Sequence, residues 1–201
     1  MSMSQTPART ALLSWPPKSR FLFLRHGCTD YNQNGLRCGG DLDIPLNAEG
    51  LRQADAAARS IATCGWPLAW IVASPLQRTQ STAAAVAKAL GGTTVEVDSR
   101  LLERRLGDWN GQSVQLTESA MRRGETPNGG ESRAEFRARV LDWLNDWRPR
   151  LAEPGLVVAS KGVARVLSEE LAGQDCGADN CQALIFEQDK AGFSVRPLNR
   201  G

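Results

Sequence analysis

The single histidine of this 201-residue chain, His26, lies between an arginine and a glycine in the run Arg25-His26-Gly27. A neighbouring guanidinium disfavours the protonated imidazole, and a neutral imidazole is a competent nucleophile. The arginine side chain would also neutralise an incoming phosphoryl group, and glycine lets the backbone approach a ligand closely. The run fits a surface histidine at the start of a loop as well, so by itself it leaves both interpretations open.

Two further charged residues have types and positions suited to phosphate chemistry. Arg78 follows Ser74-Pro75, which we expect to cap and open a helix. Arg78 then lies in the first helical turn, where unpaired N–H groups and the helix dipole favour an anion that a guanidinium can bind bidentately. Glu103, in the run 102–105, suits a general acid. The alternatives are that Arg78 faces solvent and that Glu103 only forms ion pairs with its basic neighbours.

The segments around these residues alternate between expected strands and expected helices. The strands are predicted at 21–24, 69–73, 93–97 and 156–159, with a closing pair at 183–187 and 193–197. The helices are predicted at 48–63, 74–90, 114–123, 131–151 and 163–171. This alternation predicts an α/β fold of three αβα layers, with a mostly parallel central sheet and helices on both faces.

Ligands of such sheets bind at the carboxyl ends of the strands. His26 follows the first strand, Ser74 and Arg78 the second, Glu103 the third, and Ser160-Lys161-Gly162 the fourth. We therefore expect these groups to meet at one edge of the sheet. We expect a single domain over 20–201, preceded by a mobile tail over 1–19.

The composition is that of a soluble globular protein: 41% of residues are hydrophobic, 23% are charged and the net charge is +2. Its 20 arginines and four lysines are offset by 22 acids spread along the chain, which indicates neither a nucleic-acid partner nor an anionic membrane. One histidine excludes sites that need two imidazoles. The N-terminal 20 residues contain no apolar run typical of a signal peptide or a membrane span.

The five cysteines form an odd, scattered set without a C-x-x-C pair, so we expect neither a disulfide framework nor a zinc site. This cysteine usage favours a reducing, cytoplasmic location. A cysteine-dependent phosphatase requires arginine six positions after the nucleophile, and no cysteine here has one.

The motifs together resemble a known family. The stretch 24–54, LRHGCTDYNQNGLRCGGDLDIPLNAEGLRQA, closely resembles the opening of the histidine phosphatase superfamily, which includes cofactor-dependent phosphoglycerate mutases. The likeness continues through ASPLQRTQSTA at 73–83, LERRLGDWNG at 102–111 and GGES at 129–132, and it covers 20–198. It implies a phosphoglycerate mutase-like fold.

The resemblance also implies roles for individual residues. His26 matches the nucleophile that becomes phosphohistidine, Arg25 and Arg78 match the arginines of the phosphate pocket, and Glu103 matches the proton donor. Asn32 matches a phosphate-contacting asparagine, and Arg37 a further basic residue of the same loop. No metal or other cofactor is implied, because arginines supply the charge that Mg²⁺ supplies in kinases. The implied partner is a small phosphorylated substrate.

The sequence departs from the family where the fourth strand ends. The family has a second histidine there, in a V-x-H-G-G segment, and this chain has Ser160, followed by Lys161 and Gly162. A preorganised donor of that kind contributes roughly 3 to 4 kcal/mol, or a hundred- to thousandfold in rate. Ser160 retains a hydroxyl donor, and we hypothesise that Lys161 partly replaces the missing charge, so that both belong to the phosphate-binding set. The opposite hypothesis is that Lys161 points to solvent.

These features favour a phosphomonoester hydrolase that works through phosphohistidine and is impaired by the missing histidine. The short interval between Glu103 and Glu131 favours a phosphatase over a mutase, because the mutases are typically longer there. A weakly active or inactive phosphate-binding homologue and a phosphoglycerate mutase remain as alternatives. We expect residues 112–127 to select the substrate.

Overall fold

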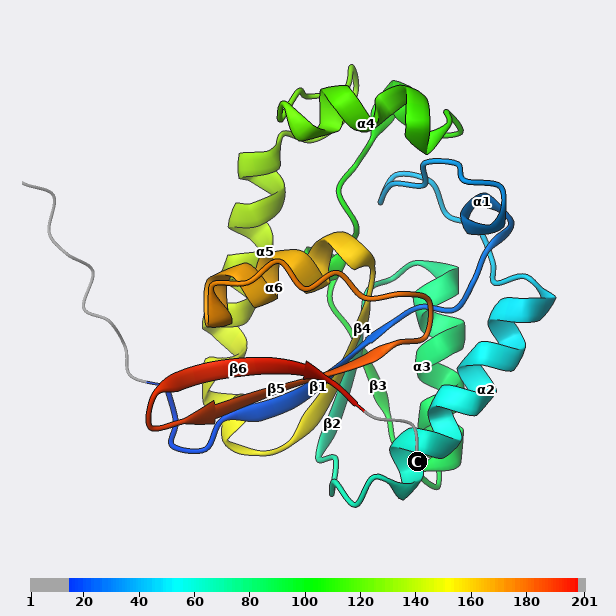
Figure 1. The fold of residues 1–201 in the computed structure, drawn as a ribbon. Coiled ribbons are helices and arrows are strands. Elements are labelled where there is room, and N and C mark those ends of the chain that lie inside the picture. The colour runs from blue at the N-terminus through cyan, green and yellow to red at the C-terminus, as the bar shows by residue number, and fades with distance from the viewer. Residues whose placement is uncertain (1–14, 199–201) are drawn as a thin grey trace, which may run out of the picture.

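The apolar runs of the chain form a six-stranded sheet covered by helices on both faces, as the computed structural model of residues 15–198 shows (Figure 1). The strands are β1 (Arg20–Arg25), β2 (Trp70–Ala73), β3 (Val95–Val97), β4 (Gly155–Ala159), β5 (Ala183–Asp189) and β6 (Gly192–Pro197). Their order is β3-β2-β4-β1-β5-β6. The first four are parallel, and β5 and β6 are antiparallel to their neighbours, so the predicted three-layer fold and mostly parallel sheet are confirmed.

The helices of the described chain follow the predicted alternation. They are α1 (Asp30–Gln33), α2 (Ala48–Thr63), α3 (Gln77–Ala89), α4 (Val114–Arg122), α5 (Arg133–Trp147) and α6 (Lys161–Ala172). Short 3-10 turns lie at η1 (Ser99–Leu101), η2 (Gly107–Trp109) and η3 (Arg148–Ala152). In Figure 1, α2 and α3 lie on one side of the sheet, α5 and α6 on the other, and α4 stands above the remaining layers.

The central strand β1 divides its side chains between the two helix layers. Phe21 and Phe23 pack in the core that contains the α5 residue Trp143, whereas Leu22 and Leu24 pack in the core formed with α2 and α3. Alternate residues of a strand point to opposite faces, so a strand buried on both faces is apolar throughout. That requirement explains the uninterrupted apolar run before Arg25.

Element boundaries differ from prediction where local chemistry intervenes. The predicted helix over 131–151 is two elements, because Pro149 lacks the N–H that would continue α5 and the chain forms η3 there. The predicted strand over 93–97 is shorter, since only Val95–Val97 pairs with β2.

The predicted helix cap at Ser74 is wrong. Helix α3 begins at Gln77, whose backbone N–H donates to Asp43 Oδ1 at 2.8 Å. The Ser74 hydroxyl instead bonds to the Thr79 hydroxyl at 2.8 Å. Asp43 is 34 residues away in sequence, so local sequence signals favoured the nearer serine. The placement of Arg78 in the first turn of α3 is correct.

The N-terminal segment falls partly outside the described residues. Of the expected tail over 1–19, residues 1–14 are not described, and residues 15–19 contact the domain. The Trp15 ring meets Phe193 edge-on with centroids 5.1 Å apart, and Ser19 is fully buried. Among residues 15–198, no helix has the length and apolar character needed to cross a membrane.

Candidate active site

The carboxyl ends of the two central strands lie side by side and carry the first polar groups of the site. Arg25 pairs with Ala159 across β1 and β4, and the His26 backbone N–H donates to the Ala159 carbonyl at 3.1 Å. The Ser74 N–H, just after β2, donates to the Val158 carbonyl at 3.2 Å. Segments distant in sequence therefore converge at one edge of the sheet, as predicted.

His26 is held as a neutral imidazole with a defined tautomer. Its side chain is buried, and Nδ1 lies 2.8 Å from the carbonyl oxygen of Gly27. A carbonyl only accepts, so Nδ1 carries the proton and the Nε2 lone pair is free. Burial lowers the pKa of His26 well below its ordinary value, and the positive charges of Arg78 and Arg25 lower it further. The predicted effect of Arg25 on the imidazole is present, but burial is the larger cause.

The backbone around His26 is fixed by side chains from other elements. The Gly27 N–H donates to Thr82 Oγ1 at 3.1 Å, and Asn180 Nδ2 donates to the His26 carbonyl at 3.1 Å. Gly27 has no room for a side chain, because a Cβ there would overlap the Gly50 carbonyl. These contacts fix the backbone on both sides of the His26 imidazole.

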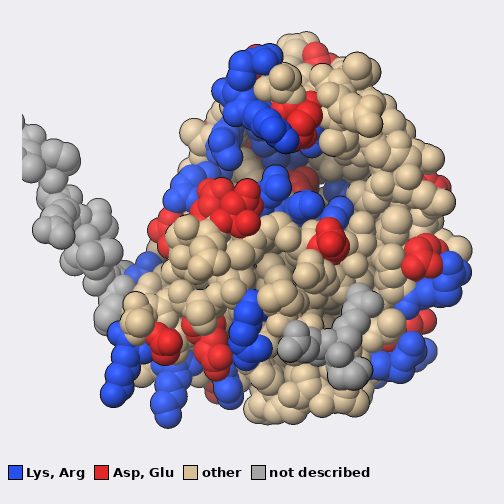
Figure 2. All heavy atoms as spheres, in the orientation of Figure 1, with Lys and Arg blue, Asp and Glu red and all other residues tan. Residues whose placement is uncertain are grey.

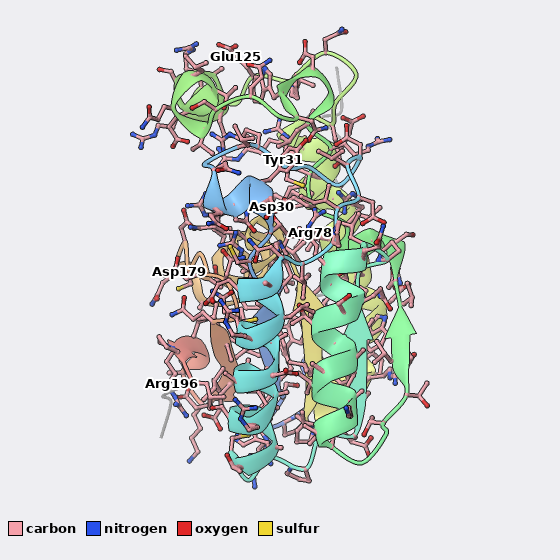
Figure 3. The ribbon with its side chains drawn as sticks, turned by 90° about the vertical axis from the view of Figure 1, so that its right-hand side faces the viewer. Asp30, Tyr31, Arg78, Glu125, Asp179 and Arg196 are labelled. Atoms are coloured by element: carbon pink, nitrogen blue, oxygen red, sulfur yellow. The ribbon has the colours of Figure 1, made fainter. Side chains whose placement is uncertain are left out.

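The two arginines flank His26 with part of each guanidinium unused. Arg78 is 1% exposed and donates from Nη1 to the Leu42 carbonyl at 2.9 Å and from Nη2 to the Gly39 carbonyl at 3.0 Å. Figure 3 shows Arg78 at the end of α3 that faces Asp30 and Tyr31. Arg25 donates from Nη1 to the Ala178 carbonyl at 3.1 Å, and burial lowers its pKa. Arg78 is thus no solvent-facing arginine.

Three buried polar atoms of this region have no hydrogen-bond partner among the described residues. They are Nε of Arg25, Nε of Arg78 and the hydroxyl of Ser160. Buried polar atoms are almost always satisfied, so unsatisfied ones require an explanation such as a ligand. All three can donate, and two belong to guanidinium groups, so the arrangement suits an anion.

The Glu103 carboxylate is held by backbone groups instead of a cation. Oε1 accepts from the Arg104 N–H at 2.7 Å, and Oε2 accepts from the Gly162 N–H in the first turn of α6 at 2.9 Å. No side-chain cation among residues 15–198 forms an ion pair with it, so the alternative of pairing with basic neighbours does not hold. A Cβ at position 162 would overlap Glu103 Oε1, so any larger residue there would displace the Glu103 carboxylate.

Asn32 lies close to His26, whereas Arg37 is directed to another element. The Asn32 side-chain oxygen accepts from Thr29 and from Asn180 Nδ2 at 3.2 Å, which leaves its amide nitrogen available. Arg37 donates from Nε to Thr117 Oγ1 at 2.8 Å and pairs with Glu118 of α4 at 2.8 Å. Its guanidinium therefore already pairs with a carboxylate, which Arg122 also contacts at 3.0 Å.

A cavity of about 860 Å³ extends from this region to α4, and Figure 2 shows Lys and Arg side chains gathered around the hollow. Arg25, Asn32, Arg37, Glu103 and Lys161 all line it. Helix α4 contributes Val114, Glu118 and Met121, all within the segment 112–127 that we expect to select the substrate.

Sequence reasoning missed several residues that shape the site. Thr82 and Asn180 position the His26 backbone, and Arg104 and Arg133 line the cavity. Thr82 and Arg104 lie within the family-like segments 73–83 and 102–111, so the family resemblance could have identified them. Asn180 and Arg133 lie outside the four family-like segments, so no sequence pattern points to them.

Comparisons with known proteins agree with this geometry. A family model described as "Histidine phosphatase superfamily (branch 1)" matches residues 21–200. A glucosyl-3-phosphoglycerate phosphatase of Mycolicibacterium vanbaalenii is 35% identical over 171 residues, which span 77% of this chain and 74% of that protein. The Mycobacterium tuberculosis protein of the same name is 41% identical over 143 residues, which span 67% of this chain but only 59% of the relative.

Solved structures show the same fold. A mycobacterial glucosyl-3-phosphoglycerate phosphatase complexed with VO3 superposes with a TM-score of 0.72 at 30% identity, covering 89% of this chain and 97% of that one. A phosphoglycerate mutase from Bacillus anthracis gives a TM-score of 0.76 at 18% identity, covering 90% of this chain and 92% of that one, and this likeness concerns the fold alone.

Proposed function

This chain belongs to the histidine phosphatase superfamily (branch 1) and is a phosphatase of the histidine type, and we propose that His26 is its nucleophile toward small phosphomonoesters. The observation that carries the proposal is a neutral, buried imidazole beside two guanidinium groups that each retain an unpartnered buried Nε. The neutral form supplies a lone pair, and the unused donors suit a phosphoryl group.

The proposed reaction has two steps. In the first, the Nε2 lone pair of His26 attacks phosphorus, the bond from phosphorus to the ester oxygen breaks, and protonated Glu103 gives its proton to the departing alcohol. In the second, water attacks phosphorus, its proton passes to the Glu103 carboxylate, and the phosphorus–nitrogen bond breaks to release inorganic phosphate. Arg25 and Arg78 neutralise the charge of the transferring group throughout, with Asn32 donating from its amide.

We further propose that Ser160 stands where other members of the family have their second histidine. Its buried, unpartnered hydroxyl supports the role of a neutral donor to a phosphoryl oxygen. A hydroxyl carries no charge, so turnover is expected to be slower than with an imidazolium. Arg37 is the weakest member of the proposed phosphate-binding set, because its guanidinium already pairs with Glu118.

The substrate class is proposed from the cavity. A volume of about 860 Å³ is that of a site for a whole small molecule, so the alcohol part of the ester occupies most of it. The mycobacterial relatives are named for a phosphorylated sugar acid. We propose a phosphorylated small metabolite of comparable size for this chain.

The test of the nucleophile uses the fact that the chain has one histidine. The protein is mixed with p-nitrophenyl [³²P]phosphate and quenched within milliseconds in alkali, in which phosphohistidine is stable. We expect an acid-labile label in the wild-type protein and none in a His26→Asn variant of unchanged melting temperature. Turnover without such a label would show direct attack by water. Binding of orthovanadate without label or turnover would show a phosphate-binding protein instead of an enzyme.

Ser160 is tested by one substitution that removes its hydroxyl and one that introduces a histidine. We expect Ser160→Ala to lower kcat about tenfold, because a donor to the transferring group is lost, and Ser160→His to raise kcat by one to two orders of magnitude. If neither substitution changes kcat, the donor at position 160 does not limit the reaction.

A further inference from the structure

The last five residues before β5, which we call the 178–182 loop, lie against the chain that leaves β1 (Figure 1). The Ala178 carbonyl accepts from Arg25 Nη1 at 3.1 Å, and the Gln182 carbonyl accepts from the Arg25 N–H at 3.3 Å. The Cys181 N–H donates to the carbonyls of Arg25 and His26 at 3.1 and 3.3 Å. The loop therefore contacts both Arg25 and the nucleophile.

Two buried residues anchor the 178–182 loop on either side of Asn180. Ala178 packs in the core that contains Trp143, and Cys181 packs in the core formed with α2 and α3. Cys181 has a φ of 51°, in the left-handed region that L side chains rarely adopt. Such conformations persist only where the surrounding structure holds them, and they are concentrated at functional sites. The loop is thus held firmly in place.

The side chain of Asn180 joins two residues of the site. Its Nδ2 donates to the His26 carbonyl at 3.1 Å and to Asn32 Oδ1 at 3.2 Å. A carbonyl oxygen only accepts, so the atom facing the His26 carbonyl must be the amide nitrogen, and this contact fixes which way the Asn180 amide is turned. Each of its two hydrogens then serves one acceptor, so Asn180 has no amide hydrogen left for a phosphoryl oxygen.

The Asn32 side-chain oxygen receives donors from two parts of the chain. The Thr29 N–H and hydroxyl donate to Oδ1 at 3.2 and 3.0 Å, and Asn180 donates to it from the 178–182 loop. The N–H groups can only donate, so they hold the oxygen of the Asn32 amide on their side. The amide nitrogen is turned to the other side, and Asn32 lines the cavity.

Helix α1 cannot hold the Asn32 amide near His26 by itself. It spans only Asp30–Gln33, and Thr29, its cap, bonds reciprocally with Asn32. One helical turn is not stable alone, and these contacts fix the amide relative to α1 but not relative to the nucleophile. Among the described residues, the bond from Asn180 is the one contact of the Asn32 side chain that reaches beyond α1 and its cap.

We propose that Asn180 is a positioning residue that holds the Asn32 amide nitrogen in a fixed place relative to the His26 imidazole. This inference rests on the proposed function for the role of Asn32 as a donor to the phosphoryl group. A donor that is oriented before the ligand binds needs no reorganisation when charge develops on the transferring group. Asn180 acts through Asn32, and one amide keeps nucleophile and donor in register.

The test is a double-mutant cycle read out as the dissociation constant of orthovanadate, measured by calorimetric titration. Asn180→Leu removes both donors and keeps a similar side-chain volume, whereas Asn32→Ala removes the amide through which Asn180 acts. We expect Asn180→Leu to weaken vanadate binding about tenfold in the wild-type background, since a hydrogen bond to an anion contributes about that factor. In the Asn32→Ala background we expect a change within about twofold, because residues that act together are not additive.

Gln182→Ala is the matched control within the same loop. The Gln182 side chain accepts from the Asp179 N–H at 2.8 Å and forms no hydrogen bond with Asn32 within residues 15–198. Its effect on vanadate binding, whatever its size, should be the same in the wild-type and Asn32→Ala backgrounds. Melting temperatures verify that each variant is folded, and Asn180→Ala takes the place of Asn180→Leu if leucine prevents folding.

The outcomes separate this inference from the proposed function. If vanadate binds but the wild-type protein neither turns over nor labels His26, the proposed function fails, and a cycle with the expected coupling still supports the role of Asn180. Equal weakening by Asn180→Leu in both backgrounds would mean that Asn180 only supports the loop, and no weakening in the wild-type background would mean that Asn32 needs no such support. Either result overturns the inference, and the absence of both vanadate binding and turnover would overturn both proposals.

Discussion

Replacing Gly162 by alanine should separate the stability of the protein from its catalysis. Position 162 lies in the first turn of α6, and its N–H holds Glu103 Oε2 at 2.9 Å. An added Cβ would lie 3.0 Å from Glu103 Cδ and closer still to Oε1, whereas ordinary contacts begin at 3.4 Å. The carboxyl group must therefore move by about 1 Å, and a misplacement of that size costs about a hundredfold in rate.

The folded state should tolerate this substitution. The helix is right-handed at 162, so alanine is intrinsically favoured over glycine there by up to about 1 kcal/mol. Gly173→Ala is the matched control, because Gly173 ends the same helix with φ 66°, a left-handed conformation that costs an alanine about 1 kcal/mol or more. We expect Gly162→Ala to keep its melting temperature and to lose activity. We expect Gly173→Ala to have a lower melting temperature and to keep its activity.

The choice of substrate makes the assay specific for proton donation. Glycerol 3-phosphate releases a poor leaving group that needs a proton, whereas p-nitrophenyl phosphate releases a stable nitrophenolate. We expect kcat of Gly162→Ala to fall about a hundredfold with the first and a few-fold with the second. A kcat for glycerol 3-phosphate within twofold of wild type would refute the role of Glu103. Equal losses with both substrates would show that the shift disturbs phosphoryl transfer itself.

Two further predictions concern stability. The pKa of His26 in the folded chain is well below 6.5, so between that pKa and 6.5 the unfolded chain binds a proton that the folded chain does not. The free energy of unfolding should therefore fall as the pH drops below 6.5, by at most about 1.4 kcal/mol per pH unit. Melting temperatures of wild type and His26→Gln should therefore converge on acidification, and parallel curves would contradict this linkage. Thr82→Val removes the acceptor of the buried Gly27 N–H and should cost about 1–3 kcal/mol in urea unfolding; a loss below about 0.5 kcal/mol would mean that the N–H has another acceptor.

The sequence predicted the fold well because the signals for it are local. The apolar run before Arg25 and the helical spacing over 48–63 gave β1 and α2 correctly, since periodicity reports burial directly. The cap of α3 was mispredicted because Asp43 reaches Gln77 only in the folded chain. Capping by a residue distant in sequence leaves no pattern around the helix it caps.

The residues that meet at the carboxyl ends of the strands could be predicted from the sequence, whereas those of the outer cavity could be predicted less well. His26, Arg25 and Arg78 follow strand ends or open a helix, and sheet topology alone brings them together. Arg37 pairs with Glu118 of α4, a contact that depends on the folded chain and that a sequence does not encode locally. Which cations of the cavity pair with an acid follows only from the folded structure.

The lone imidazole makes this protein its own spectroscopic probe. A uniformly ¹⁵N-labelled sample contains one histidine ring, so a long-range ¹H–¹⁵N correlation spectrum holds a single imidazole spin system that needs no assignment. The two ring nitrogens differ in shift according to which one is protonated, and the Nδ1 hydrogen bond to Gly27 fixes that pattern in the resting protein. Protonation, tautomer exchange and phosphorylation would each move the same few peaks, and a reaction could be followed in real time at one residue without altering the chain.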